Sequence, residues 1–168
     1  MTVPLPSEYA ETASVTSLPK GQMKQFISFK IGREEYGIDI MAVREIRGWS
    51  QTTVLPNQSP HVCGVMNLRG TIVPVFDLRS RFGMGVTVAS SSHAVIVVAV
   101  LDRLIGLLVD AVSDILTIDV GEIRAVPETD AGVSVDFLAG IVSVKDRMVV
   151  ILALDKLFSQ IDATNPLD

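Results

Sequence analysis

The stretch GIDIMAVREI, residues 37–46, decides the fold, because it recurs without a gap as GLLVDAVSDI at residues 106–115. Each copy follows an apolar run and a short polar turn. The similarity continues downstream, where residues 64–77 resemble residues 140–155 with a small insertion in the second copy. These blocks predict a tandem repeat of about 70 residues, since similarity at a fixed spacing is typical of a repeated architecture. Chance similarity between short strands is the alternative.

Both copies have the composition of short β-strands. The 168-residue chain contains 24 Val and 14 Ile, and β-branched side chains favour a pleated, half-buried surface. Turn residues separate the apolar runs, which predicts a mainly all-β protein whose halves each form a small barrel or a curled antiparallel sheet. In the first half we expect strands near residues 24–31, 35–40, 44–48, 62–68 and 71–76.

Two local features add detail to the predicted structure of the last strand and turn of the first copy. Pro74 cannot donate a hydrogen bond to a neighbouring strand, so the strand at 71–76 is expected to be an edge strand or to carry a bulge. Residues 67–71 are typical of a hairpin tip in which Gly70 supplies a positive φ. Arg69 is therefore expected to point outward from a rigid turn.

The repeat predicts two subdomains that pack together. A globule of about 70 residues buries only some 60% of its unfolded surface and is marginal alone, so the halves should share a contact and leave a groove between them. Helical turns are expected where apolar residues have helical spacing, at Leu78 and Phe82 and at Leu154, Leu157, Phe158 and Ile161. The predicted organisation is a flexible tail at 1–22, a first barrel at 23–84, a second barrel with a C-terminal helix at 85–160, and a flexible tail at 161–168.

Composition argues against several classes of function. The uncharged apolar run at 94–101 is far shorter than the roughly 18 residues of a membrane-spanning helix, and residues 1–18 lack the early basic cluster of a signal peptide. A cytoplasmic protein without membrane insertion is expected. The net charge of −5 argues against nucleic-acid binding, which depends on clustered Lys and Arg. The single cysteine, Cys63, permits no internal disulfide and no thiolate cage for zinc.

Candidate catalytic groups are sparse. His61 and Cys63 are two residues apart, as on one side of a strand, which resembles a nucleophile with its base. A buried thiol beside a turn histidine is the interpretation we favour. Glu34 and Glu35 fall in a turn, where solvated charge is the ordinary explanation. Without metal-ligand spacing or a phosphate-binding loop, the sequence predicts a protein that is not an enzyme and holds no metal or cofactor.

The remaining prediction is a surface that binds a partner. The repeated block carries the same local structure in each half, with Val43, Glu45 and Ile46 recurring as Val112, Asp114 and Ile115. Core packing is the alternative for the apolar members, and solvated charge is the alternative for Arg69. Trp49 suits a strand-end cap and an interface equally well.

The motifs EYGIDI at 35–40, EIRG at 45–48 and NLRG at 67–70 resemble, in this order, those of the CheW family of bacterial chemotaxis coupling proteins. The resemblance covers about residues 24–158 without a large gap and includes IVPV at 72–75, DLR at 77–79 and DRM at 146–148. It implies an adaptor without activity of its own, built from two SH3-like five-stranded barrels around a shared core.

The resemblance also implies partners. Similar proteins bind the cytoplasmic tip of transmembrane chemoreceptors, a long helical hairpin, in the groove between the barrels. They also bind the regulatory domain of the histidine kinase CheA, and the alternation of these two proteins builds rings in membrane-associated receptor arrays, where self-association is a further expected contact. Two alternatives stay open: a small-ligand sensor or regulatory subunit that uses the groove as a pocket, and a coupling domain cut from a larger protein.

The family resemblance supplies the predicted site residues. Val43, Glu45, Arg69, Val95 and Ile115 match positions implicated in receptor or kinase contacts, whereas Ala94 stands where a valine is common. The full predicted receptor- and kinase-binding set is Val43, Glu45, Ile46, Asn67, Leu68, Arg69, Gly70, Val95, Val112 and Ile115. A groove edged by the apolar members Val43, Ile46, Val112 and Ile115 would take one face of a receptor helix, with Glu45 and Arg69 as a charged rim.

Overall fold

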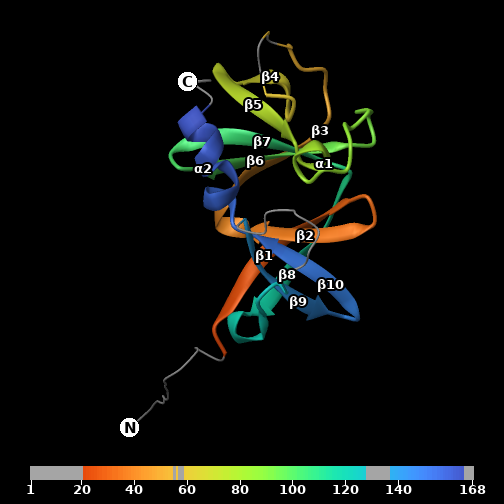
Figure 1. The fold of residues 1–168 in the computed structure, drawn as a ribbon, viewed down its shortest axis with the longest axis vertical. Helices are drawn as coiled ribbons and strands as arrows, with labels where there is room; N and C mark the ends of the chain where they lie inside the picture. Colours follow the sequence, from red (N-terminus) through yellow and green to blue (C-terminus); the bar gives the residue numbers. More distant parts are fainter. Residues whose placement is uncertain (1–20, 55, 57–58, 128–136, 165–168) are drawn as a thin grey trace.

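The structure, a computed structural model, describes residues 21–54, 56, 59–127 and 137–164, which form two lobes (Figure 1). Lobe 1 is a sheet of strand order β8-β1-β2-β10-β9, with β1 Met23–Ile31, β2 Glu34–Asp39, β8 Ala111–Asp119, β9 Leu138–Val144 and β10 Arg147–Leu152. Lobe 2 is a sheet of strand order β3-β6-β7-β5-β4, with β3 Val43–Gly48, β4 Val62–Leu68, β5 Thr71–Asp77, β6 Ala94–Val100 and β7 Arg103–Val109. The predicted mainly-β fold with two five-stranded units is confirmed.

Short helices connect and follow these strands. The predicted helical turns are confirmed as α1 Leu78–Arg81, which follows β5, and α2 Leu154–Thr164, which follows β10. Two 3-10 turns, η1 Ile40–Ala42 and η2 Val120–Glu122, follow β2 and β8. The predicted tail from residue 161 begins too early, because α2 continues through Thr164. Residues 1–20 and 165–168 lie outside the described residues.

The lobes do not follow the predicted division at residue 84. β1 and β2 of the first repeat share a sheet with β8, β9 and β10 of the second, and the other strands of the two repeats form lobe 2. Strands of different repeats pair antiparallel in β1–β8 and β3–β6, and parallel in β2–β10 and β5–β7, where Tyr36 lies opposite Val150 and Phe76 lies opposite Leu107. Parallel neighbours need a long connection and not a tight hairpin, and here each parallel partner comes from the other repeat.

Both sheets curl until their two end strands meet. In lobe 2, Thr53 follows β3 and exchanges two backbone hydrogen bonds with Val65 of β4, at 2.9 and 2.8 Å. In lobe 1, Arg124 follows β8 and makes the equivalent pair with Ile141 of β9, at 2.8 and 2.7 Å. These bridges close each sheet along a seam between its first and last strands.

The apolar side chains form three clusters, one inside each lobe and one between the lobes. β6 shows how the clusters connect, because its side chains alternate between two buried faces. Val95 and Val97 pack inside lobe 2, whereas Ile96 and Val98 pack in the central cluster between the lobes. The central cluster also holds Phe29 of lobe 1, so the two lobes share one core.

Pro74 lies in an inner strand, which corrects the expectation of an edge strand. β5 lies between β7 and β4 in the sheet. Its parallel pairing with β7 begins only at Val75, so no ladder hydrogen bond to β7 is required of Pro74. The register shift lies on β4, between Val62 and Gly64, and not at the proline.

Candidate functional site

An ion pair crosses the seam of lobe 2. Glu45 on β3 and Arg69 at the β4–β5 turn come from the two end strands of the sheet, and Arg69 Nη2 lies 2.7 Å from Glu45 Oε1. The side chain of Arg69 is 74% exposed and that of Glu45 is 27% exposed. The sequence motifs EIRG and NLRG thus meet in space, with the guanidinium outermost.

The turn that carries Arg69 is held rigidly. Arg69 and Gly70 both have positive φ, at 51° and 90°, which is the conformation of a tight hairpin turn. The Asn67 side chain accepts a hydrogen bond from the Gly70 N–H at 2.7 Å. The predicted positive φ at Gly70 and the outward direction of Arg69 are both confirmed.

The charges at the seam favour an ionised Glu45. The hydrogen bond from Arg69 is the largest effect and lowers the pKa of Glu45; desolvation opposes it less strongly, and the positive charges of Arg69 and Arg47 lower the pKa further. Arg47 Nε lies 3.8 Å from Glu45 Oε2. An exposed pair of this kind contributes little to stability, and its main structural effect is to orient the guanidinium.

Bulges on β3 and β8 bring predicted apolar residues onto one face. Val43 lies opposite Val98 and Ile46 opposite Ile96, and both partners point into the central cluster. Residues three apart in a regular strand face opposite ways, so the extra residue at Arg44 is what aligns Val43 with Ile46. The same shift on β8 aligns Val112 with Ile115, which lie opposite Phe29 and Ile27.

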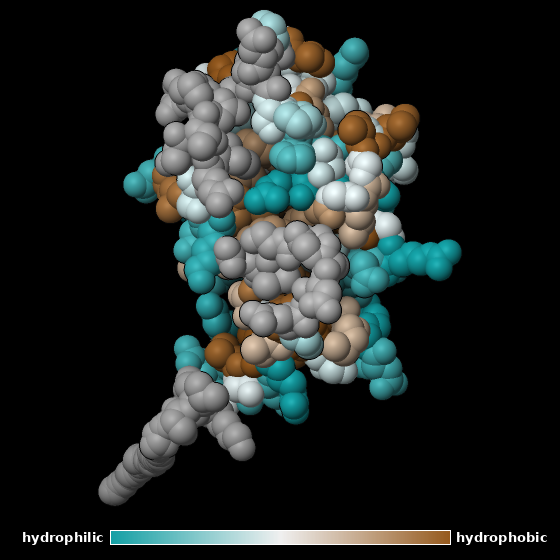
Figure 2. Space-filling view, viewed as in Figure 1, coloured by the Kyte–Doolittle hydropathy of each residue, from teal (hydrophilic) through white to brown (hydrophobic). Residues whose placement is uncertain are grey.

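These four residues extend the central cluster to the protein surface. Val43 and Val112 are half-buried and pack against the cluster, while Ile46 and Ile115 are exposed, Ile115 by 51%. β3 and β8 are end strands of their sheets, and within the described residues each pairs with a single neighbouring strand, β6 and β1 respectively. Figure 2 shows hydrophobic groups at the surface of both lobes, interleaved with hydrophilic ones.

Two members of the predicted set lie in the core instead. Val95 and Leu68 are buried in the cluster inside lobe 2. Either residue could influence a binding surface only through the packing beneath it. Asn67 and Gly70 are exposed beside Arg69 and remain available for contact.

Lobe 1 lacks a counterpart of the seam ion pair. The repeat aligns Glu45 with Asp114 and Arg69 with Lys145. In the described part of the chain Asp114 and Lys145 form no ion pair, and Asp114 Oδ1 instead accepts from the Ile115 N–H at 2.8 Å. The charged rim therefore distinguishes lobe 2 from lobe 1, although the apolar pairs occur in both.

The His61 and Cys63 pair has the properties of structural residues. Burial raises the pKa of the Cys63 thiol to about 12, so the nucleophilic thiolate is scarce at neutral pH. His61 Nδ1 lies 2.9 Å from Ser80 Oγ, and burial lowers the pKa of the imidazole. Trp49 is half-buried against the core of lobe 2, and its backbone N–H donates to the His93 carbonyl at 3.0 Å, so it packs at the strand end.

Glu35 differs from the expectation of a solvated turn residue. It lies within β2, is 6% exposed, and has its Oε1 3.5 Å from Arg147 Nη1. Position within the strand explains the burial, because alternate residues of β2 point into lobe 1. This ion pair joins β2 to β10 within lobe 1.

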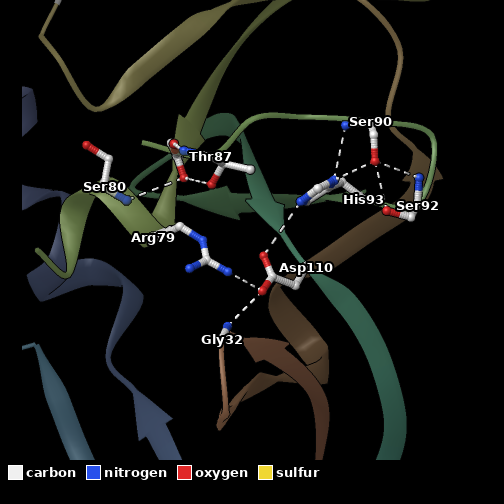
Figure 3. Close-up of polar contacts among 9 residues, drawn as sticks. Gly32, Arg79, Ser80, Thr87, Ser90, Ser92, His93 and Asp110 are labelled. Atoms are coloured by element: carbon white, nitrogen blue, oxygen red, sulfur yellow. Dashed lines mark hydrogen bonds and ion pairs between the residues drawn. The ribbon is translucent and has the colours of Figure 1, made fainter. Parts of the chain in front are cut away.

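A polar cluster around Asp110 was not found by sequence reasoning (Figure 3). Its Oδ2 accepts from the Gly32 N–H at 2.7 Å and from Arg79 Nη2 at 2.5 Å. His93 Nε2 lies 3.7 Å from its Oδ1, and the Asp110 N–H donates to the Lys30 carbonyl at 3.0 Å. Gly32 and Lys30 belong to lobe 1 and Arg79 to lobe 2, so one carboxylate contacts both lobes.

A hollow of about 590 Å³ lies between the lobes at the start of α2. Phe26 and Ile151 of lobe 1 and Val100 of lobe 2 contribute to its apolar lining, and Lys24 and Asp39 form an ion pair at 3.1 Å on its wall. Among the described residues no group of His, Cys, Asp and Glu could hold a metal ion. In that same part of the chain no helix is both long and apolar enough to cross a membrane.

Comparison with known proteins identifies the family. The CheW-like domain family matches residues 25–162. A probable chemotaxis protein CheW of Rhizobium etli is 40% identical over 150 residues, which cover 89% of this chain and 96% of that protein. The chemotaxis protein CheW of Klebsiella aerogenes is 39% identical over 136 residues, which cover 81% and 82% of the two chains.

A solved structure agrees with this assignment. The crystal structure of the scaffolding protein TtCheW from Thermoanaerobacter tengcongensis superimposes with a TM-score of 0.75 at 35% sequence identity, covering 82% of this chain and 93% of that one. The same family is indicated by the family match, by the relatives and by the shared two-lobed fold. The chain belongs to the family of CheW chemotaxis scaffold proteins.

Proposed function

We propose that this protein is a cytoplasmic adaptor that couples transmembrane chemoreceptors to the histidine kinase CheA, without catalysing a reaction itself. The observation that carries the proposal is that β3 contributes to two features at once. Val43 and Ile46 form its apolar face, and Glu45 forms the ion pair with Arg69 at the seam. β3 thus carries the apolar residues and also the Glu45 carboxylate, which orients the Arg69 guanidinium of the β4–β5 turn.

The apolar face suits a helical partner. An amphipathic helix places an apolar stripe against a hydrophobic groove and uses residues about one turn apart as anchors. The exposed Ile46 and Ile115, each backed by a half-buried valine, offer such anchoring points on both lobes. The cytoplasmic tip of a chemoreceptor is a helical hairpin, and we assign this face to it.

The charged rim formed by Glu45 and Arg69 is suited to selecting a partner and to fixing the register of a bound helix. Arg69 contacts Glu45 through Nη2 and stays mostly exposed, so its remaining donors can reach a carboxylate or a carbonyl of a partner. Rim charges of this kind steer approach and fix register more than they add affinity. Signalling then needs no chemistry in the adaptor, since a change in relative affinity for receptor and kinase is enough to move the kinase equilibrium.

Co-sedimentation tests the proposal. The full chain is incubated with membranes that contain a chemoreceptor, with purified CheA, and with both, and the pellet is assayed for each protein. The adaptor function predicts that the chain sediments with receptor membranes and that CheA sediments only when the chain is present. Failure of the wild-type chain to bind either partner would overturn it.

The inter-lobe hollow favours one other candidate, a small-ligand sensor or regulatory subunit. A volume of about 590 Å³ falls within the usual range for ligand pockets of about 300–1,000 Å³, and its lining is mainly apolar with a single ion pair. A saturable thermal shift in a broad ligand screen, lost in Ala99→Trp, would support this candidate. If no ligand shifts the melting temperature, the hollow gives no support for a ligand-binding function as an alternative to the adaptor function.

A further inference from the structure

Two crossings between the lobes, β2–β3 and β7–β8, occupy aligned places in the repeat and have unequal polar contacts. The repeat aligns Asp110, which joins β7 to β8, with Met41, which lies in η1 between β2 and β3. Met41 is 77% exposed, and its N–H is held only by the neighbouring Asp39 carboxylate at 2.9 Å. Asp110 instead accepts from both lobes at once. The β7–β8 crossing therefore has polar contacts with both lobes. The polar contact at Met41 is local, and the η1 crossing is held by apolar packing of Ile40 and Ala42 against the central cluster.

The hydrogen bonds of Asp110 give the contact between the lobes a directional restraint that the apolar core lacks. The central cluster between the lobes is apolar, and apolar burial has no preferred direction. Hydrogen bonds to a carboxylate are directional and strong, particularly from a guanidinium. The Asp110 side chain is 24% exposed, so its contacts with Arg79 and Gly32 are only partly screened by water.

We propose that Asp110 is a clasp that fixes the angle between the two lobes. The first residue of β8, Ala111, follows it directly, so the clasp also sets where Val112 and Ile115 lie relative to β3 on lobe 2. When the clasp opens, the lobes shift about η1, the crossing that is held by apolar packing and has only a local polar contact at Met41. The effect on receptor binding rests on the adaptor function, whereas the effect on the lobe angle does not.

Pulsed electron–electron distance measurement on the isolated full chain tests the clasp. Spin labels are placed at Thr71→Cys in lobe 2 and Ser143→Cys in lobe 1, both exposed positions, in a Cys63→Ser background. Asp110→Asn and Arg79→Gln each open the clasp, and Asp102→Asn, in the exposed β6–β7 turn, is the matched control. Both clasp variants are expected to shift or broaden the distance distribution, and the control to leave it unchanged.

Hydrogen exchange shows whether the clasp has opened. The Gly32 N–H donates to Asp110, so its exchange is expected to accelerate about tenfold in Asp110→Asn and to stay unchanged in Asp102→Asn. Faster exchange at Gly32 with an unchanged distance distribution in both clasp variants would overturn the proposal. Loss of the folded far-UV spectrum in both variants would also overturn it, because the cluster would then hold the fold and not the lobe angle.

Receptor co-sedimentation separates this inference from the adaptor function. Weaker binding by Asp110→Asn, together with an altered distance, supports the clasp and its consequence. If the wild-type chain does not bind receptor membranes, the adaptor function fails, while the distance measurement on the isolated chain still decides the clasp.

Discussion

Arg69 Nη2 and Glu45 Oε1 lie 2.7 Å apart across the seam where the sheet of lobe 2 closes. The two residues are far apart in sequence, and the relationship exists only because β3 and β4 are the two end strands of a curled sheet. The backbone bridge between Thr53 and Val65 already closes that seam. The ion pair is therefore free to serve recognition.

Arg69→Glu is expected to weaken receptor or kinase binding without unfolding the protein. The side chain is mostly exposed, so its replacement should change the melting temperature by less than about 4 °C. Thermal denaturation and co-sedimentation on the same preparation check this prediction. A much lower melting temperature would show that Arg69 is structural.

Exchanging the two charges separates pairing from recognition. The double variant Glu45→Arg with Arg69→Glu restores an ion pair across the seam but reverses the sign of the outermost charge. We expect its binding to remain as weak as that of Arg69→Glu alone, because the partner meets the wrong charge. Recovery of wild-type binding would mean that only the internal pair matters.

The seam pair also predicts a pH dependence of stability. The pKa of Glu45 is lowered in the folded protein from its ordinary value of 4.5, so the folded state favours the ionised form. The stabilising contribution is fully present above pH 4.5 and is lost as the pH falls through the lowered folded pKa. Melting temperatures of the wild-type protein and Glu45→Gln should therefore converge at acid pH, and a constant difference down to pH 2 would contradict the assignment.

Val95 and Ile115 were predicted as equivalent contacts but should behave differently. Val95→Ala removes two buried methyl groups from lobe 2 and is expected to destabilise the fold by about 2 kcal/mol. Ile115→Ala truncates a side chain that is 51% exposed and should mainly weaken binding. Chemical denaturation beside co-sedimentation distinguishes them, and a stability loss for Ile115→Ala as large as that for Val95→Ala would contradict this division.

Gly140 is required by the seam of lobe 1. A Cβ there would lie 2.7 Å from the Arg124 carbonyl oxygen, in a stretch where Arg124 and Ile141 share two backbone hydrogen bonds. Gly140→Ala is expected to cost about 1–3 kcal/mol because the backbone must move. Gly48→Ala is the control, since a Cβ at Gly48 meets no atom within 4 Å. Equal unfolding midpoints for the two variants would refute the argument.

The sequence predicted the positions of the strands more accurately than it predicted which strands pair with each other. Apolar alternation and turn residues predicted the strands near 24–31, 62–68 and 71–76 closely, because these patterns depend on neighbours along the chain. The exchange of strands was missed, since β3 has the same alternation whether it pairs with β2 or with β6. Partner choice depends on packing that no local pattern records.

The site was predictable only where its geometry depends on neighbours along the chain. The outward turn at Arg69 follows from Asn67 and Gly70 alone, whereas the alignment of Val43 with Ile46 requires a bulge that spacing in a strand does not reveal. The clasp at Asp110 was missed because its donors, Gly32 and Arg79, are distant in sequence. The difference between Met41 and Asp110 in the aligned repeat was the one signal available.

Kinase activity measured with all three proteins tests the central claim most directly. CheA autophosphorylation is followed with receptor membranes and increasing amounts of the wild-type chain, Arg69→Glu, or Asp102→Asn as the control. The adaptor function predicts activation that depends on receptor and on chain together, that is equal for Asp102→Asn and that is reduced for Arg69→Glu at every concentration. Receptor-dependent kinase activity that is the same with and without the wild-type chain would contradict it.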